Sequence, residues 1–167
     1  FSTIFNNFIC FKLNICSLRK LFIKKRFKSH SCYTYTIIYI EERMISMNKA
    51  LIVIDYTVDF VAQNGKLTCG EPGQKLEQPI EQLIETFLNE EQYIVFACDL
   101  HEENDPYHPE TTLFPPHNIA GTSGRDLYGA IQPLYENIQH LPNVYYMDKT
   151  RYSSFAGTNL AQKLRER

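Results

Sequence analysis

The chain has 167 residues, a formal net charge of −2 and 44% hydrophobic residues. Charge is unevenly distributed, because residues 1–46 hold eight Lys and Arg against two Asp and Glu, whereas residues 47–167 hold nine against seventeen. Residues 47–167 are therefore moderately acidic and have no basic patch, which argues against a nucleic-acid or anionic-membrane partner.

Residues 1–46 differ in composition from the rest of the chain. They contain no Ala, Gly, Pro, Val, Asp or Gln, and they are rich in Phe, Ile, Lys, Asn, Ser and Tyr. Translated AT-rich non-coding DNA has this composition. Codons made only of purines can encode Glu41–Arg43, as in a bacterial ribosome-binding site, and a short spacer separates these residues from Met47. We therefore interpret Met47 as the start. An organelle presequence and a genuine basic extension are the alternatives. The apolar stretch of this segment carries Asn and Lys and is too polar to predict a membrane span.

Residues 47–167 are long enough for one domain core and too short for two. Only two cysteines, Cys69 and Cys98, fall in this range. This usage is typical of a reduced cytoplasmic protein and not of a disulfide framework.

Apolar, β-branched runs alternate with amphipathic segments along the domain. The expected strands are residues 50–55, 93–99 and 143–149, and the expected helices are residues 80–88, 125–138 and 157–167. Pro79 sits where a first helical turn tolerates proline, whereas Pro133 interrupts the second helical segment. Strands and helices in this order predict right-handed crossovers and an α/β fold with a Rossmann-like parallel sheet.

Each predicted strand ends in ionisable residues. Asp55 ends the first strand, Asp99 and then His101 follow the second, and Asp148 with Lys149 ends the third. A strand emerging into solvent explains any one of these ends. The carboxyl ends of parallel strands open onto one edge of the sheet, however, so three such ends favour a site there.

The second strand end carries a candidate metal site. Asp99 and His101 share one face of the strand because side chains repeat every second residue, and the following Pro-rich loop returns His117. One carboxylate and two imidazoles suit Zn²⁺, Fe²⁺ or Mn²⁺. Glu110 or His108 could add a fourth protein ligand. The alternative is a polar loop in which the histidines beside prolines are turn residues.

Three stretches of the domain carry a family resemblance. They are KALIVIDYTVDFVAQNGKLTCGEPGQ, FACDLHEENDPYHPETTLFPPHNIAGTSGRDLYG and MDKTRYSSFAGTNLAQKLRER. In this order and spacing they resemble the nicotinamidases of the isochorismatase-like cysteine hydrolase superfamily. The resemblance implies a six-stranded parallel sheet with helices on both faces, incomplete here at the C-terminus. It also implies hydrolysis of the small molecule nicotinamide to nicotinic acid and ammonia in NAD salvage, with a homo-oligomer possible for the full-length protein.

The resemblance also implies roles for individual residues. Asp55 and Lys149 match the acid and the lysine of an Asp-Lys-Cys triad. Asp99, His101 and His117 match the metal ligands, with zinc, iron or manganese as the ion. Glu110 matches a position that supplies a further ligand in some members. Phe60 and Tyr152 match aromatic residues beside the substrate ring, and the metal would hold the pyridine nitrogen.

The nucleophilic cysteine of the family does not match Cys69 or Cys98. Its expected place is the turn after a further strand, beyond Arg167, so we expect the 167-residue polypeptide itself to be inactive. Two other interpretations stay open. One is a different isochorismatase-like amidase or hydrolase, and the other is a non-catalytic, truncated metal-binding domain.

Overall fold

The computed structural model describes residues 11–14 and 48–167. Apart from residues 11–14, the predicted leader lies outside the described residues, as does Met47. The strands are β1 (Phe11–Asn14), β2 (Lys49–Ile54), β3 (Tyr93–Asp99) and β4 (Val144–Lys149). The helices are α1 (Val58–Val61), α2 (Glu71–Gln74), α3 (Glu77–Asn89), α4 (Ile131–Ile138) and α5 (Leu160–Arg165), with a 3₁₀ turn, η2, at Ser123–Arg125.

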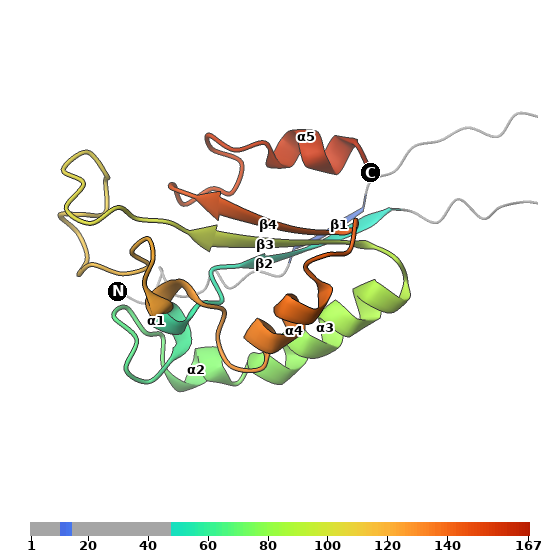
Figure 1. The fold of residues 1–167 in the computed structure, drawn as a ribbon, viewed down its shortest axis with the longest axis horizontal. Coiled ribbons are helices and arrows are strands. Elements are labelled where there is room, and N and C mark those ends of the chain that lie inside the picture. The colour runs from blue at the N-terminus through green and yellow to red at the C-terminus, as the bar shows by residue number, and fades with distance from the viewer. Residues whose placement is uncertain (1–10, 15–47) are drawn as a thin grey trace, which may run out of the picture.

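The described sheet has the order β1-β2-β3-β4 (Figure 1). Strands β2, β3 and β4 are parallel, whereas β1 pairs with β2 in the antiparallel sense. The register aligns Ile54 with Ala97 and Asp99 with Lys149, so the three parallel strands end side by side. The predicted parallel sheet is confirmed, and its carboxyl edge gathers the strand ends.

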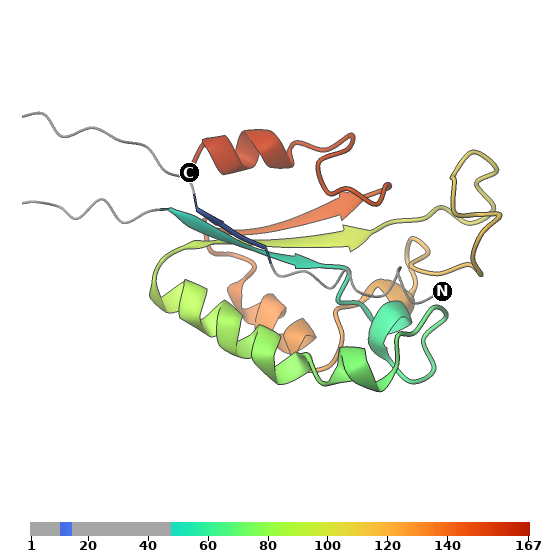
Figure 2. The same ribbon diagram turned by 180° about the vertical axis from the view of Figure 1, so that it is seen from behind.

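Helices cover both faces of the sheet, as Figures 1 and 2 show from opposite sides. Helices α3 and α4 pack on one face over a core that includes Phe96 and Cys98 of β3. Helix α5 lies on the other face, where Leu160 and Leu164 pack against Val95 and other strand residues. All seven residues of β3 are buried, because helices cover the strand from both sides.

Two helices differ from the boundaries that the sequence predicted. The predicted helix over residues 125–138 begins only at Ile131, because Gly129 has a φ of +59° and the Tyr128 N–H donates to the Tyr56 carbonyl. Pro133 therefore lies in the first turn of α4, where its missing N–H costs nothing. The last predicted helix is confined to α5.

The long segment between β3 and α4 extends beyond the carboxyl ends of the strands (Figure 1). The fold thus places one extended loop directly over the edge at which the sequence predicted a site.

Within residues 48–167, none of the helices has both the length and the apolar composition needed to cross a bilayer.

Candidate active site and metal-binding group

Lys149 connects the ends of all three parallel strands. Its ammonium lies 2.7 Å from Asp55 Oδ2 and 2.6 Å from Asp99 Oδ1. Only 1% of the Lys149 side chain is exposed, so both ion pairs are shielded from bulk water. The edge predicted from the sequence therefore exists as one hydrogen-bonded cluster of two acids and a lysine.

The backbone holds Asp55 in an unusual conformation. Its φ is +55°, a left-handed value that residues other than glycine adopt infrequently. The Asp55 N–H donates to the Ala97 carbonyl, and Asp55 Oδ1 accepts a 2.9 Å hydrogen bond from the Asp99 N–H. This fixed conformation turns the carboxylate towards Lys149, and strain of this kind is concentrated at functional sites.

The clustered charges shift the pKa of each member. Burial and the nearby Asp99 carboxylate raise the pKa of Asp55 to about 7, against the opposing effect of the Lys149 ammonium. Burial alone would lower the pKa of Lys149, but the two carboxylates outweigh it and raise that pKa. An acid that titrates near neutral pH beside a charged lysine is suited to proton transfer.

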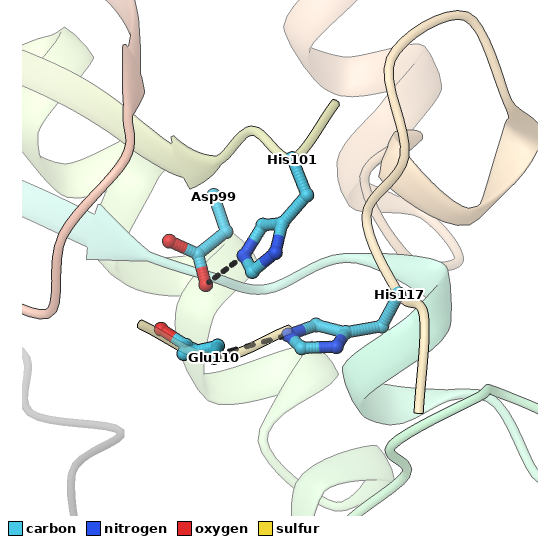
Figure 3. A group of neighbouring side chains, drawn as sticks. All are labelled: Asp99, His101, Glu110 and His117. Atoms are coloured by element: carbon cyan, nitrogen blue, oxygen red, sulfur yellow. Dashed lines mark ion pairs between the residues drawn. The ribbon is translucent and has the colours of Figure 1, made fainter. Parts of the chain in front are cut away.

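A second group of buried side chains adjoins this cluster. It consists of Asp99, His101, Glu110 and His117, each contributing one ligand-type atom, and these atoms all lie within 4.8 Å of one another (Figure 3). Asp99 belongs to both groups, because Oδ1 contacts Lys149 and Oδ2 faces His101. The four side chains come from the end of β3 and from the loop after it, and they converge on one point (Figure 3).

The donor atoms of this group fit a metal ion. His101 Nε2 lies 3.6 Å from Asp99 Oδ2, and His117 Nε2 lies 3.5 Å from Glu110 Oε2. A tetrahedral zinc ion with bonds of about 2.0–2.2 Å holds its ligand atoms roughly 3.3–3.6 Å apart. Both Nε2 atoms are buried without a hydrogen-bond partner, a costly state for a polar atom. An ion bound between them would satisfy both nitrogens.

The hydrogen bonds of His117 set its tautomer. His117 Nδ1 lies 2.8 Å from the Pro115 carbonyl, which only accepts, so Nδ1 carries the proton. In the neutral ring Nε2 then presents its lone pair towards Glu110, as a metal ligand must. Burial lowers the pKa of His117, but the nearby Glu110 carboxylate and the hydrogen bond to the Pro115 carbonyl outweigh it and raise the pKa of the metal-free ring.

His108 is separated from this group by its hydrogen bonds. Its Nδ1 accepts from the Glu110 N–H at 3.2 Å, and its Nε2 lies 2.9 Å from the Thr150 carbonyl. Both nitrogens are occupied, so of the two residues that the sequence offered as a fourth ligand, the geometry brings in Glu110 and leaves out His108.

The two predicted aromatic residues lie beside the site in different ways. The Phe60 ring packs against His117 with 5.2 Å between ring centroids. Tyr152 is 65% exposed. Its partial burial raises its pKa, and the nearby Glu110 and Asp99 carboxylates raise that pKa further. Both rings border the two charged groups, and their contact with a substrate stays a prediction.

The two described cysteines are poorly suited as nucleophiles. Cys98 is fully buried on the α3 and α4 face of the sheet, and burial raises its pKa to about 12. Burial also raises the pKa of Cys69, which lies in the loop before α2. A thiol with a raised pKa is a poor nucleophile at neutral pH.

Comparison with known proteins identifies the family. A sequence model of the isochorismatase domain matches residues 49–167. The chain belongs to the isochorismatase family. It is 64% identical over 121 residues to an uncharacterized isochorismatase family protein, PncA, of Bacillus subtilis strain 168, covering 72% of this chain and 66% of that protein. The family member described here thus spans just under two thirds of that relative's length.

Solved structures agree with this membership. A nicotinamidase/pyrazinamidase PncA from Bacillus subtilis superimposes with a TM-score of 0.69 at 59% identity, over 70% of this chain and 64% of that one. A pyrazinamidase from Pyrococcus horikoshii, solved in complex with zinc, gives a TM-score of 0.57 at 27% identity, over 70% and 63% of the two chains. The isochorismatase fold is therefore shown for the part of the domain present.

Several residues that support the site were missed by sequence reasoning. Asp59 Oδ2 accepts a 2.8 Å hydrogen bond from the N–H of Asn118, the residue after His117. Gly124 packs so closely on the same carboxylate that a Cβ there would lie 2.1 Å from Oδ2. Arg125 Nε donates to the Asp99 carbonyl at 2.9 Å. These contacts join segments far apart in sequence, so no local spacing indicates them.

Proposed function

We propose that the domain to which residues 49–167 belong hydrolyses nicotinamide to nicotinic acid and ammonia. The observation that carries the proposal is the Lys149 ammonium, which binds Asp55 on one side and the metal-group residue Asp99 on the other. An acid–lysine pair and a metal-type donor set thus share one site. Relatives at 59% identity that are named nicotinamidases support this substrate.

Asp55 and Lys149 are proposed to activate a cysteine nucleophile that is neither Cys69 nor Cys98. The Lys149 ammonium would stabilise the thiolate, and Asp55, with its pKa near 7, would take the thiol proton. The thiolate then bonds to the amide carbon, the C–N bond breaks, and the departing ammonia takes the proton from Asp55. Water cleaves the resulting thioester to nicotinic acid and restores the thiol.

The metal group is proposed to orient the substrate. Asp99, His101, Glu110 and His117 would hold a divalent ion, with zinc supported by the zinc-bound pyrazinamidase from Pyrococcus horikoshii. When bound, the ion would supply a Lewis-acid contact for the pyridine nitrogen of nicotinamide. Phe60, which packs on His117, would contact the flat ring and exclude water beside it.

The direct test uses the protein expressed from the complete gene. Nicotinic acid and ammonia should appear in equal amounts from nicotinamide, and Asp55→Asn should lower kcat by about a hundredfold or more, the size of a lost general base. Asp126→Asn, which changes an exposed carboxylate, is the control and should act like the wild type. Folded, zinc-loaded wild-type protein that releases no ammonia would refute the proposal.

A further inference from the structure

His108 is buried between the metal group and the end of β4, yet it is not a member of the donor set. Only 6% of the residue is exposed, and its ring packs against His101 with 4.2 Å between centroids. Both ring nitrogens are hydrogen-bonded to backbone groups on two different segments. A buried imidazole with two such partners is a fixed connection between those segments.

The two hydrogen bonds determine which nitrogen carries the proton. The Thr150 carbonyl only accepts, so Nε2 must donate to it across 2.9 Å. The Glu110 N–H only donates, so Nδ1 must accept from it across 3.2 Å. One neutral tautomer satisfies both bonds, and no other side chain of similar size carries a donor and an acceptor at these two positions.

Each partner adjoins a functional side chain. The Glu110 N–H belongs to the residue whose carboxylate faces His117 Nε2 at 3.5 Å. The Thr150 carbonyl follows directly on Lys149, whose ammonium bridges Asp55 and Asp99. Arg151 also donates to the Thr150 carbonyl, but from an exposed position. The His108 ring therefore spans from the metal-group loop to the lysine strand.

We propose that His108 is a positioning residue with two separable functions. Through Nδ1 it holds Glu110 at the metal group, and through Nε2 it ties the loop after β3 to the segment that follows Lys149. The inference rests on the proposed metal site and extends it to a residue that binds no ion. Residues that orient metal ligands change metal affinity by about 10- to 100-fold when replaced.

Two substitutions separate the bonds. In His108→Asn, the Oδ1 atom takes the place of Nδ1 and keeps the Glu110 bond, but the side chain is too short to reach Thr150. In His108→Gln, the Nε2 amide takes the place of the ring Nε2 and keeps the Thr150 bond, but no acceptor remains at the Nδ1 position for the Glu110 N–H. His140→Asn and His140→Gln, at an exposed histidine, are the matched controls.

The experiment measures zinc affinity by competition with a chromophoric chelator, and amide hydrogen exchange of the peptide around residues 150–154, in the 167-residue chain. We expect His108→Gln to bind Zn²⁺ at least about tenfold more weakly than the wild type, and His108→Asn to stay within about threefold. We expect exchange to accelerate in His108→Asn and to match the wild type in His108→Gln. The His140 variants should change neither.

Three results would overturn the inference. If both His108 variants weaken zinc binding equally, in step with their thermal stabilities, the residue has a general packing role. If neither variant changes zinc affinity or exchange, the two hydrogen bonds have no positioning effect. If the wild type binds no Zn²⁺, or if His117→Ala binds Zn²⁺ as tightly as the wild type, the proposed metal site itself fails. The third result is distinguished from the first two by the wild-type and His117→Ala measurements alone.

Discussion

Replacing Lys149 with methionine would remove the buried ammonium that lies between Asp55 and Asp99. Methionine is similar in length and apolar, so the substitution removes the charge and leaves two carboxylates facing each other. Only 1% of the lysine side chain and 6% of the Asp99 side chain are exposed, against 21% for Asp55, so water cannot replace the Asp99 pair and replaces the Asp55 pair only in part. Breaking a buried pair in this way costs about 3–5 kcal/mol.

This cost is measurable by urea unfolding in the presence of a chelator, which removes any contribution from metal. With an m-value of about 2 kcal/mol/M, Lys149→Met should lower the midpoint by roughly 1.5–2.5 M. Lys75→Met is the control, because its ion pair with Glu71 is exposed and contributes little. Adding Asp55→Asn to Lys149→Met should restore part of the loss by removing one of the two facing charges.

The pH dependence of Lys149→Met gives a second check. Without the ammonium, the pKa of Asp55, already about 7, moves further above its unfolded value, and the pKa of Asp99 loses the lowering that Lys149 contributes. A carboxyl whose pKa is raised on folding binds its proton more tightly in the folded state, so lower pH stabilises the variant relative to the wild type. A midpoint that matches the wild type at neutral pH, with no gain at acidic pH, would refute the ion-pair reasoning.

Three further predictions concern other parts of the domain. Cys98, fully buried with a pKa of about 12, should resist alkylation in the native protein and react only on unfolding, which mass spectrometry of individual peptides can follow. Gly124→Ala should weaken zinc binding and lower stability by about 1–3 kcal/mol, because the new Cβ would collide with the Asp59 carboxylate. Tyr152→Ala should leave the unfolding midpoint unchanged, since the ring is 65% exposed, but raise KM for nicotinamide in the protein from the complete gene.

The arrangement of the sheet was predictable because the apolar runs are long and uninterrupted. Residues 93–99 form β3 with the predicted boundaries, and the ends of β2 and β4 fall within one residue of the prediction. The parallel order then places Asp55, Asp99 and Lys149 together without knowledge of the loops. This part of the site follows from strand periodicity and topology.

The loop after β3 was less predictable because its path depends on local backbone conformation. Asn104 and Asn118 have φ values of +63° and +45°, and these left-handed residues turn the chain in ways that the sequence does not specify. Whether Glu110 or His108 joined the metal group was left open for this reason. The four-residue helices α1 and α2 were also missed, because one turn is too short to show a helical period.

The measurement that tests the central proposal most directly compares nicotinamide with benzamide, which has the same amide and no ring nitrogen. Turnover of both should be measured with the protein from the complete gene, zinc-loaded and after chelation. If the metal group orients the pyridine nitrogen beside the Asp55–Lys149 pair, chelation should lower kcat/KM for nicotinamide by at least about tenfold and leave the slower turnover of benzamide nearly unchanged. Equal turnover of the two amides, or equal loss of both on chelation, would contradict the account.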